Sequence, residues 1–369
     1  MKAIVLVGGE GTRLRPLTLT TPKPLLPIAN RAFLERQLSW LAGHGVDEVV
    51  LSLGYLPDAF HRHFAHDPAG QDVFGDVRLR YAVEDEPLGT AGAIRFAADG
   101  FDERFVVCNG DVLTTLDLGA MVRFHDEHEA EATISLTQVT DPSAFGVVPT
   151  RPDGQVIAFV EKPPRDRAPS NWINAGTYVL EPGFLDRIPP RLQVSVERET
   201  FPRMLEQPGL LYGYKTDDYW LDIGTPEKYL EAHADVLAGR LGLPPVDGAV
   251  EHEPGVWVQA DVCIGDDVDV EPPVLLGAGV RLDGGARVAA SVLGPGVVVE
   301  QRAEVVRSVV HARAQICHGA SVVDSIVGAE ALCKPDSATS EHTVVGPGVT
   351  ITSGTRISRG RVPSGHGSR

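Results

Sequence analysis

The sequence predicts an α/β domain with a Rossmann-like, doubly wound, mostly parallel sheet, followed by a parallel β-helix. Two observations lead to this prediction. From residue 1 to about 235, apolar strand-like runs alternate with helix-like segments, a pattern typical of a sheet covered on both faces. After about residue 250 the chain is rich in Val, Gly and Ala, and a short motif recurs about every 18 residues.

The N-terminal part predicts an amphipathic helix over residues 32–44, where Phe33, Leu34, Leu38 and Leu41 follow helical spacing. The strand candidates are apolar runs at residues 3–7, 47–53, 79–83, 105–108, 133–138 and 156–159. Ligands of such sheets bind at the carboxyl ends of the strands. A functional site is therefore expected where these strands end.

The C-terminal repeat begins with a hydroxyl residue and ends on Gly or His, at Ser291-Val-Leu-Gly, Ser308-Val-Val-His, Ser325-Ile-Val-Gly and Thr343-Val-Val-Gly. A period near 18 equals three six-residue units, which suits one coil of a triangular β-helix. The pattern resembles the left-handed β-helix of hexapeptide-repeat proteins. A Gly/Val-rich antiparallel sandwich is the alternative.

These changes in pattern predict a first domain over residues 1–238, a linker rich in Pro and Gly over 239–257, and the β-helix over 258–362. An exposed β-helix end needs a cap or a partner. We therefore expect the β-helix to mediate homo-oligomerisation or to pack against the first domain, without chemistry of its own. Its histidines, His311, His318 and His342, are expected on the coil surface.

The composition narrows the range of partners. The 369 residues carry a net charge of −17, which argues against nucleic acid or an anionic membrane as the main partner. The four cysteines are scattered, as expected for reduced thiols in a cytoplasm rather than for disulfides or zinc. No membrane-spanning segment is expected, because the apolar stretches are too short. No signal peptide is expected, because the first strand follows Met1-Lys2 directly.

A glycine-rich turn, Gly8-Gly9-Glu10-Gly11, follows the first strand and leads into Thr12-Arg13. Such a turn brings backbone N–H groups against phosphate, and Arg13 and Lys23 add positive charge nearby. The spacing is neither the Rossmann dinucleotide motif nor a Walker loop. A tight strand-to-loop connection is the alternative to nucleotide binding.

Two aspartates are candidate metal ligands. Asp111 follows the strand at 105–108, and Asp222 stands in Trp-Leu-Asp-Ile-Gly-Thr-Pro. Two carboxylates can hold one Mg²⁺ and leave positions for phosphate oxygens. Alternatively, each aspartate caps a turn beside Gly110 or Gly224.

The longer string Gly-Gly-x-Gly-Thr-Arg-Leu-x-Pro-Leu-Thr, followed by Pro22-Lys23-Pro24, resembles the signature of the sugar-1-phosphate nucleotidyltransferases. Asn109-Gly110-Asp111, Glu161-Lys162-Pro163, Asn174-Ala-Gly-Thr and the Asp222 motif resemble later segments of that family. Within the family the chain looks most like the two-domain bacterial mannose-1-phosphate guanylyltransferases. The resemblance covers nearly the whole chain.

This resemblance implies an Mg²⁺-dependent enzyme that joins a nucleoside triphosphate to a sugar 1-phosphate and releases pyrophosphate. GTP and mannose 1-phosphate are the favoured substrates. Glucose 1-phosphate, a cyclitol phosphate, a regulatory relative without activity and an acyl-transferring β-helix are the alternatives. Arg13, Lys23 and Lys162 would be catalytic, with Arg13 at the pyrophosphate, Lys23 at the α-phosphate and Lys162 at the sugar phosphate.

The resemblance also implies the remaining site residues. The nucleotide would be bound by Leu6, Gly8, Gly9, Gly11, Thr12, Arg13, Glu84, Pro87, Gly89, Thr90, Asn109 and Gly110. The sugar phosphate would be bound by Gly146, Glu161, Lys162, Asn174 and Gly176, and the metal by Asp111 and Asp222. The segment Gly89-Thr-Ala-Gly contains no glutamine to pair with the base, in which it resembles the guanylyltransferases.

Overall fold

The computed structural model describes residues 1–66, 72–207 and 209–363. They form two compact units. One unit, here called the sheet unit, comprises Met1–Gly9 and Leu34–Trp220. The other, the β-helix unit, comprises Glu10–Phe33 and the chain from Leu221 onward.

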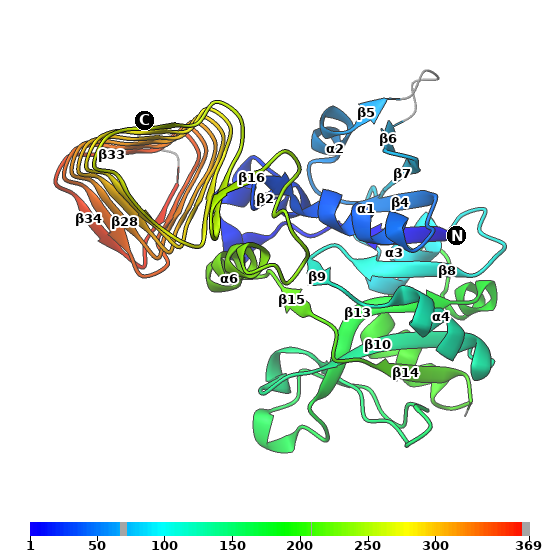
Figure 1. Cartoon of the computed structure of the whole chain (residues 1–369). Helices are drawn as coiled ribbons and strands as arrows, with labels where there is room; N and C mark the ends of the chain where they lie inside the picture. The colour runs from blue at the N-terminus through cyan, green and yellow to red at the C-terminus, as the bar shows by residue number, and fades with distance from the viewer. Residues whose placement is uncertain (67–71, 208, 364–369) are drawn as a thin grey trace. The chain divides into compact units, whose positions relative to one another are not determined.

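The sheet unit is built on a mixed sheet with the strand order β12-β11-β13-β8-β1-β4-β7-β6-β5, and β10 and β14 extend it from β13 (Figure 1). Its centre, β8-β1-β4-β7, is parallel, and β13 runs antiparallel to β8. The strands are β1 (Lys2–Leu6), β4 (Glu48–Leu53), β5 (Ala65–His66), β6 (Asp72–Phe74), β7 (Val77–Val83), β8 (Phe105–Asn109), β10 (Ala132–Gln138), β11 (Gly146–Val147), β12 (Val160–Glu161), β13 (Trp172–Leu180) and β14 (Leu211–Lys215).

Helices alternate with the strands along the chain. They are α1 (Phe33–Gly43), α2 (Pro57–His63), α3 (Gly89–Ala97), α4 (Leu118–Glu127) and α5 (Phe201–Met204), the last preceded by a π-helical turn at Val196–Thr200. The apolar positions that predicted α1 are fully buried. Asp117 caps α4 by accepting a hydrogen bond from the backbone N–H of Ala120 at 2.8 Å.

Five of the six predicted strands are confirmed with small shifts at their ends. The strand predicted at 156–159 is wrong. Val156 makes only an isolated bridge to Thr150, and Ile157 is 54% exposed. Gln155 makes a second isolated bridge, to Tyr212 of β14, and the strand next in sequence is β12.

The β-helix unit contains the predicted left-handed β-helix, in which three sheets form the sides of a triangle (Figure 1). The first side contains β16 (Val250–Glu253), β17 (Val256–Val258), β20 (Val274–Leu276), β23 (Val292–Leu293), β26 (Val309–Val310), β29 (Ile326–Val327), β32 (Val344–Val345) and β35 (Arg361–Val362). The second contains β18 (Cys263–Ile264), β21 (Arg281–Leu282), β24 (Val298–Val299), β27 (Gln315–Ile316), β30 (Leu332–Cys333) and β33 (Thr350–Ile351). The third contains β19 (Asp269–Glu271), β22 (Arg287–Ala289), β25 (Glu304–Val306), β28 (Ser321–Val323), β31 (Ala338–Ser340) and β34 (Arg356–Ser358). The strands of successive coils pair in parallel, whereas β16 runs antiparallel to β17.

The repeated hydroxyl residues form a buried ladder along one corner. Ser308 Oγ donates to the carbonyl oxygen of Val306 at 2.7 Å and accepts from the backbone N–H of Ser325 in the next coil at 3.0 Å. Ser291 makes the same bonds one coil earlier. The serine repeat in the sequence thus marks a corner where side-chain hydrogen bonds add to the backbone ladders between coils.

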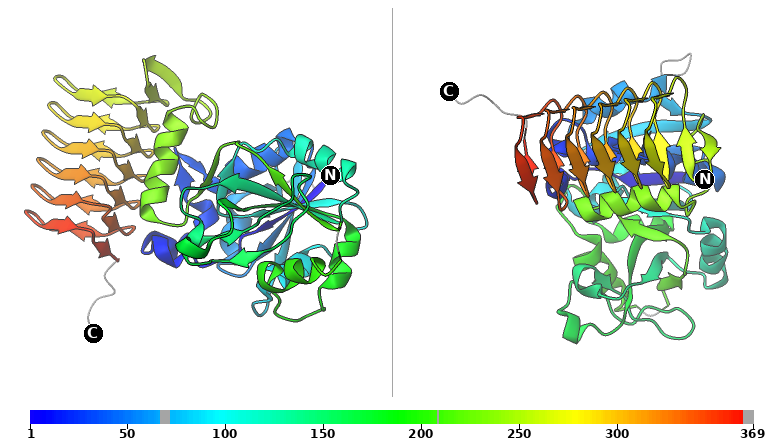
Figure 2. Two further views of the ribbon diagram at one scale, coloured as in Figure 1. Left: turned by 90° about the horizontal axis from the view of Figure 1, so that it is seen from below. Right: turned by 60° about the vertical axis from the view of Figure 1, so that its left-hand side comes forward.

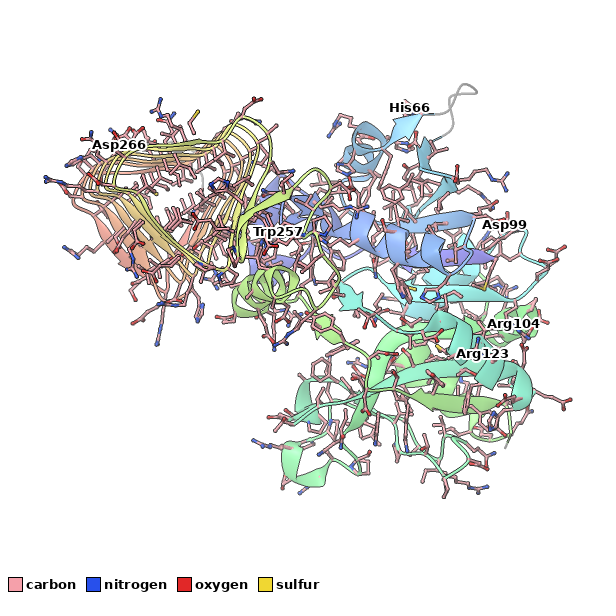
Figure 3. All side chains as sticks on the ribbon, viewed as in Figure 1. His66, Asp99, Arg104, Arg123, Trp257 and Asp266 are labelled. Atoms are coloured by element: carbon pink, nitrogen blue, oxygen red, sulfur yellow. The ribbon has the colours of Figure 1, made fainter. Side chains whose placement is uncertain are left out.

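The interior of the triangle is filled by small aliphatic side chains (Figure 3). Outside, ion pairs join successive coils, such as Arg307 with Asp324 at 2.7 Å. Stacking identical apolar positions on every coil removes them all from water, and this burial stabilises the repeat.

Two features of the β-helix unit bear on the sequence predictions. β16 and the first two residues of β17 fall inside the segment expected to be a linker. Those two residues, Val256 and Trp257, are buried. α6 (Pro226–Leu237) also belongs to this unit and runs beside the coils (Figure 2). The domain boundaries at 238 and 258 stay a prediction.

The histidines of the β-helix differ from one another. His318 is exposed and His342 is half-buried. The prediction of a surface position is wrong for His311, which is only 7% exposed. It is covered by Tyr229 of α6, whose hydroxyl lies 3.0 Å from His311 Nε2. The four cysteines are unbridged.

Candidate active site

Three of the predicted site residues come together in the β-helix unit. Lys23 Nζ lies 3.9 Å from Asp222 Oδ1. The guanidinium of Arg13 packs so closely over Gly224 that a Cβ there would collide with it. Lys23 is 7% exposed, and a buried ammonium needs a nearby carboxylate to offset its lost hydration. The result is a compact group of two cations and one carboxylate.

Local structure fixes Lys23. Lys23 stands between Pro22 and Pro24 and is the first residue of a 3₁₀ turn (Lys23–Leu25). The Leu26 N–H donates to the carbonyl oxygen of Lys23 at 3.1 Å. Gly11, at φ +60°, packs against the Lys23 stem. The predicted Pro-Lys-Pro turn therefore restricts the lysine backbone, because each proline fixes its own φ.

Asp222 ends the short strand β15 (Trp220–Asp222). Thr225 follows and caps α6 by accepting a hydrogen bond from Lys228 N–H at 3.3 Å. The Ile-Gly-Thr-Pro sequence is thus the turn into α6, with Pro226 at the first helical position. A carboxylate is thereby held close to the start of a helix.

The sheet unit gathers a second group at the carboxyl ends of its parallel strands. Leu6 pairs with Asn109, and Gly110 N–H donates to the Leu6 carbonyl oxygen at 2.8 Å. Gly8 and Gly9 follow Leu6, and Asp111 follows Gly110, before β9 (Val112–Thr114). A Cβ on Gly9 would meet no atom within 4 Å, so packing alone does not require glycine at this position.

Gln37 is a supporting residue that sequence reasoning missed. Its Nε2 donates to the Asn109 carbonyl oxygen at 2.7 Å and to that of Val112 at 3.3 Å. It therefore braces both sides of the turn that carries Asp111. Its position on the predicted helix gave no signal, because an isolated glutamine on a helix is usually solvated.

The predicted base-reading segment is held by internal hydrogen bonds. Glu84 accepts from Ser52 Oγ at 3.2 Å and from Leu88 N–H at 2.9 Å. Thr90 Oγ1 donates to Glu197 Oε2 at 2.7 Å and accepts from Val196 N–H at 2.8 Å. These side chains fix the shape of the turn, in which Pro87 is exposed. The contact of this segment with a base stays a prediction.

Gly89 is required by packing. Its φ is +69°, and a Cβ would lie 2.6 Å from the carbonyl oxygen of Val194. The stretch Leu192–Glu197, which the sequence did not single out, thus fixes the start of α3. Its own side chains contribute, since Ser195 Oγ donates to Glu197 at 2.8 Å.

The sugar-side residues also lie together in the sheet unit. Gly146 pairs with Glu161 across β11 and β12, and Lys162 N–H donates to the Phe145 carbonyl oxygen at 3.0 Å. Lys162 Nζ lies 3.4 Å from Glu161, and its side chain is 59% exposed. This lysine is therefore open to an incoming anion.

Asn174 and Gly176 lie on the neighbouring strand, β13. Gly176 N–H donates to Asn174 Oδ1 at 2.9 Å, and Asn174 Nδ2 donates to the Tyr178 hydroxyl at 2.8 Å. Burial raises the pKa of Tyr178 well above its ordinary value, so the hydroxyl stays neutral. A Cβ on Gly176 would touch the side chain of Asn109, which links the sugar-side group to the strand-end group.

Phe145 and Trp220 form an aromatic pair beside these residues, with ring centroids 5.5 Å apart. Trp220 Nε1 donates to the Ala175 carbonyl oxygen at 2.9 Å. Neither was predicted as a site residue, although Phe145 precedes Gly146 and Trp220 stands two residues before Asp222. They are far apart in the sequence and come together only in the tertiary structure, so the sequence pattern could not predict the pair.

The predicted residues thus form groups in two separate units. Gly11, Thr12, Arg13, Lys23 and Asp222 belong to the β-helix unit, and all the others belong to the sheet unit. Asp111 and Asp222 lie in different units, so their shared metal site stays a prediction. Residues 1–66, 72–207 and 209–363 contain no cluster of three or more metal-ligating side chains. Two carboxylates are nevertheless enough for a hard cation such as Mg²⁺, which can take its other ligands from phosphate or water.

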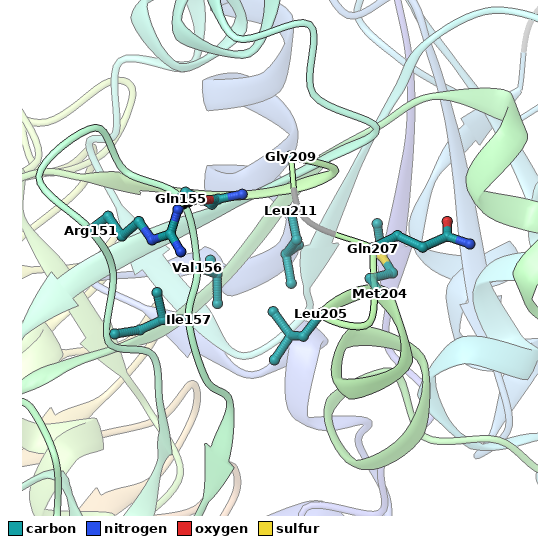
Figure 4. Close-up of a pocket in the computed structure, with 9 residues that line it drawn as sticks. All are labelled: Arg151, Gln155, Val156, Ile157, Met204, Leu205, Gln207, Gly209 and Leu211. Carbon is teal, nitrogen blue, oxygen red and sulfur yellow. Dashed lines mark hydrogen bonds between the residues drawn. The ribbon is translucent and has the colours of Figure 1, made fainter.

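One pocket of the sheet unit is unrelated to these groups. It has a volume of about 160 Å³ and is lined by residues around β14 and the 151–157 loop (Figure 4). Arg151 donates to Gln155 at 2.7 Å on its wall. None of the predicted site residues lines it.

Fold and site together define a nucleotide-transferring α/β enzyme. The chain belongs to the nucleotidyl transferase family, whose model matches residues 2–239. In its described part, no helix is long and apolar enough to cross a membrane.

Relatives in several kingdoms are similar to the chain. It is 40% identical to the mannose-1-phosphate guanylyltransferase of Mycobacterium tuberculosis, with 78% of this chain and 81% of that protein aligned. It is 39% identical to mannose-1-phosphate guanylyltransferase 1 of Arabidopsis thaliana, over 76% of this chain and 80% of the other. HddC from Yersinia pseudotuberculosis, solved also in complex with GMP-PN, matches with a TM-score of 0.53 and 30% identity, covering 63% of this chain and 97% of HddC. A UDP-glucose pyrophosphorylase from Acinetobacter baumanii shares the fold, with a TM-score of 0.56 and 22% identity over 63% of this chain and 92% of its own.

Proposed function

We propose that the protein makes GDP-mannose and pyrophosphate from GTP and mannose 1-phosphate, with Mg²⁺ as its metal. The group formed by Arg13, Lys23 and Asp222 carries this proposal, because it combines two cations with a metal-ligating carboxylate. The names of relatives about 40% identical in sequence support the choice of base and sugar.

In the reaction, an oxygen of the sugar phosphate forms a bond to the α-phosphorus of GTP. The bond from that phosphorus to the bridging oxygen breaks, and the electron pair leaves with pyrophosphate. The attacking oxygen is already anionic, so no general base is needed. Catalysis then depends on positioning and on neutralising charge.

The chain's own residues have distinct tasks in this scheme. Lys23 neutralises the α-phosphate, and Arg13 neutralises the departing pyrophosphate. The exposed Lys162 holds the attacking phosphate, while Glu161 and Asn174 face the sugar hydroxyls. Asp111 and Asp222 would hold Mg²⁺, which when bound supplies further charge neutralisation on the phosphates.

The test is a matrix of nucleoside triphosphates against sugar 1-phosphates, with pyrophosphate release as the readout. GTP with mannose 1-phosphate should give the highest kcat/KM. A higher value for glucose 1-phosphate or a cyclitol phosphate would keep the reaction and change the substrate. No release with any pair would contradict the proposed activity and favour a regulatory relative.

We also propose a cytoplasmic homo-oligomer assembled through the β-helix. The four unbridged cysteines are consistent with a reducing compartment. The first coil offers the edge strand β18, where Ile264 is 43% exposed, and an open strand edge favours pairing with another chain. Light scattering should give a multiple of the chain mass, which Ile264→Arg should reduce. A monomeric wild type would contradict this assembly.

A further inference from the structure

The segment Glu10–Phe33, which carries Arg13 and Lys23, is held within the β-helix unit by hydrogen bonds to α6 and to a coil. Asn30 Nδ2 donates to the carbonyl oxygen of Leu293, at the end of β23, at 3.0 Å. Ala29 N–H donates to His233 Nδ1 on α6 at 3.2 Å. Because these bonds come from both α6 and a coil, the segment is fixed from two directions.

A third attachment is a chain of two hydrogen bonds. The Tyr229 hydroxyl contacts the carbonyl oxygen of Pro27 and also lies 3.0 Å from His311 Nε2. The Pro27 carbonyl can only accept, so the single hydroxyl proton points to it. His311 Nε2–H must then donate to the tyrosine oxygen, and the direction runs from His311 through Tyr229 to Pro27.

Burial supports this assignment. Tyr229 is fully buried and His311 nearly so. The loss of hydration lowers the pKa of His311 to about 4, so the imidazole is neutral at neutral pH and has one N–H to give. Buried polar groups destabilise a fold unless each has a hydrogen-bond partner. Here His311, Tyr229 and the Pro27 carbonyl are hydrogen-bonded to one another in sequence.

The Tyr229 attachment connects the two segments that carry Lys23 and Asp222. Pro27 follows Lys23 after one short turn, and Tyr229 lies on the helix that begins just after Asp222. Tyr229 thus ties the lysine side of the Lys23–Asp222 pair to the aspartate side. A small shift at Pro27 would change the distance between them, and misplacing a phosphate-binding group is costly in rate.

We propose that Tyr229 and His311 are positioning residues for Lys23 and Arg13, through which the β-helix sets how the enzyme binds and activates the triphosphate. The inference rests on the proposed function for the identity of the ligand. It gives the β-helix a part in the reaction without placing any of its groups on the reacting atoms.

The variants that test this are Tyr229→Phe, His311→Leu and His311→Gln, with Val322→Ala as the control. Tyr229→Phe removes only the hydroxyl. His311→Gln keeps an N–H donor, whereas His311→Leu does not. Val322 is fully buried on the third side of the triangle, so its truncation should destabilise the β-helix without touching the segment.

We expect Tyr229→Phe and His311→Leu to reduce kcat/KM for GTP about tenfold. The KM for mannose 1-phosphate should change less than twofold. His311→Gln should recover part of the loss, and Val322→Ala should lower the melting temperature while keeping wild-type kinetics. Wild-type kinetics in both test variants, or an equal kinetic loss in Val322→Ala, would overturn the proposal.

Hydrogen–deuterium exchange of the full-length proteins separates this proposal from the proposed function. Amides of residues 10–33 should exchange faster in Tyr229→Phe than in the wild type or Val322→Ala. If the wild type releases no pyrophosphate with any substrate pair, the proposed function fails, and unchanged exchange in Tyr229→Phe would then refute the positioning role as well.

Discussion

The ammonium of Lys23 lies 3.9 Å from a carboxylate oxygen of Asp222, although almost the whole sheet unit lies between the two residues in sequence. The pair stands at the meeting point of the Pro-Lys-Pro turn and the entry to α6. The carboxylate stabilises the buried charge of the lysine. The pair thus brings a predicted metal ligand beside a predicted phosphate-binding residue.

Replacing either predicted metal ligand should nearly abolish turnover. Asp111→Asn and Asp222→Asn each remove a charged ligand while keeping the size of the side chain. We expect kcat to fall by about 10²-fold or more, with little change in the circular dichroism spectrum. Pyrophosphate release at saturating Mg²⁺ is the measurement.

The control for these variants is Asp186→Asn, which removes an exposed carboxylate outside the predicted site. It should behave as the wild type. If Asp111→Asn and Asp222→Asn both kept wild-type kcat, neither residue would be a metal ligand in the reaction.

Lys162→Met should affect one substrate far more than the other. The exposed ammonium is lost while the aliphatic stem remains, so the KM for the sugar 1-phosphate should rise about tenfold or more and that for GTP much less. Initial rates over both substrates give the two values. The control is Lys228→Met, at a half-exposed lysine of α6, which should leave both KM values unchanged. Equal rises in the two KM values for Lys162→Met would refute the assignment of Lys162 to the sugar phosphate.

The buried His311 should make stability depend on acid pH. Its pKa is lowered from 6.5 to about 4 by burial, so between these values the unfolded chain binds a proton that the folded chain does not. The free energy of unfolding therefore falls as the pH falls from 6.5 to 4. At 1.36 kcal/mol per pKa unit this amounts to about 3 kcal/mol.

Denaturant unfolding at several pH values would reveal this dependence. The slope of stability against pH should be smaller in His311→Gln than in the wild type. His318→Gln, at an exposed position, should leave the slope unchanged. Parallel wild-type and His311→Gln curves would show that His311 does not contribute.

The serine ladder should stabilise the β-helix. Ser308→Ala leaves the buried N–H of Ser325 without its acceptor, and an unsatisfied buried donor costs about 1–3 kcal/mol. Ser321, whose hydroxyl donates to Glu304 on the outer surface at 2.6 Å, is the comparison. A loss in Ser321→Ala as large as in Ser308→Ala would argue against a special role for the buried ladder.

The sequence alone determined the fold of both parts of the chain, because each rests on local periodicity. The apolar strand-like runs and the α1 pattern depend on residues near one another in sequence, and so does the Ser-Val-Val repeat. The glycine-rich turn and the Pro-Lys-Pro turn were equally local, since glycine and proline limit the backbone directly. These local motifs carry the family resemblance, and that resemblance named most of the predicted site residues.

Only the tertiary structure decided which side chains meet. His311 looked like a surface residue because nothing near it in sequence shows that Tyr229 covers it. The hydrogen bond that Thr90 Oγ1 donates to Glu197 Oε2 also could not be predicted, because Glu197 lies far along the chain. Packing between distant segments leaves no periodicity in the sequence, so the attachment of the Lys23 segment to α6 and the β-helix becomes visible only when the chain is folded.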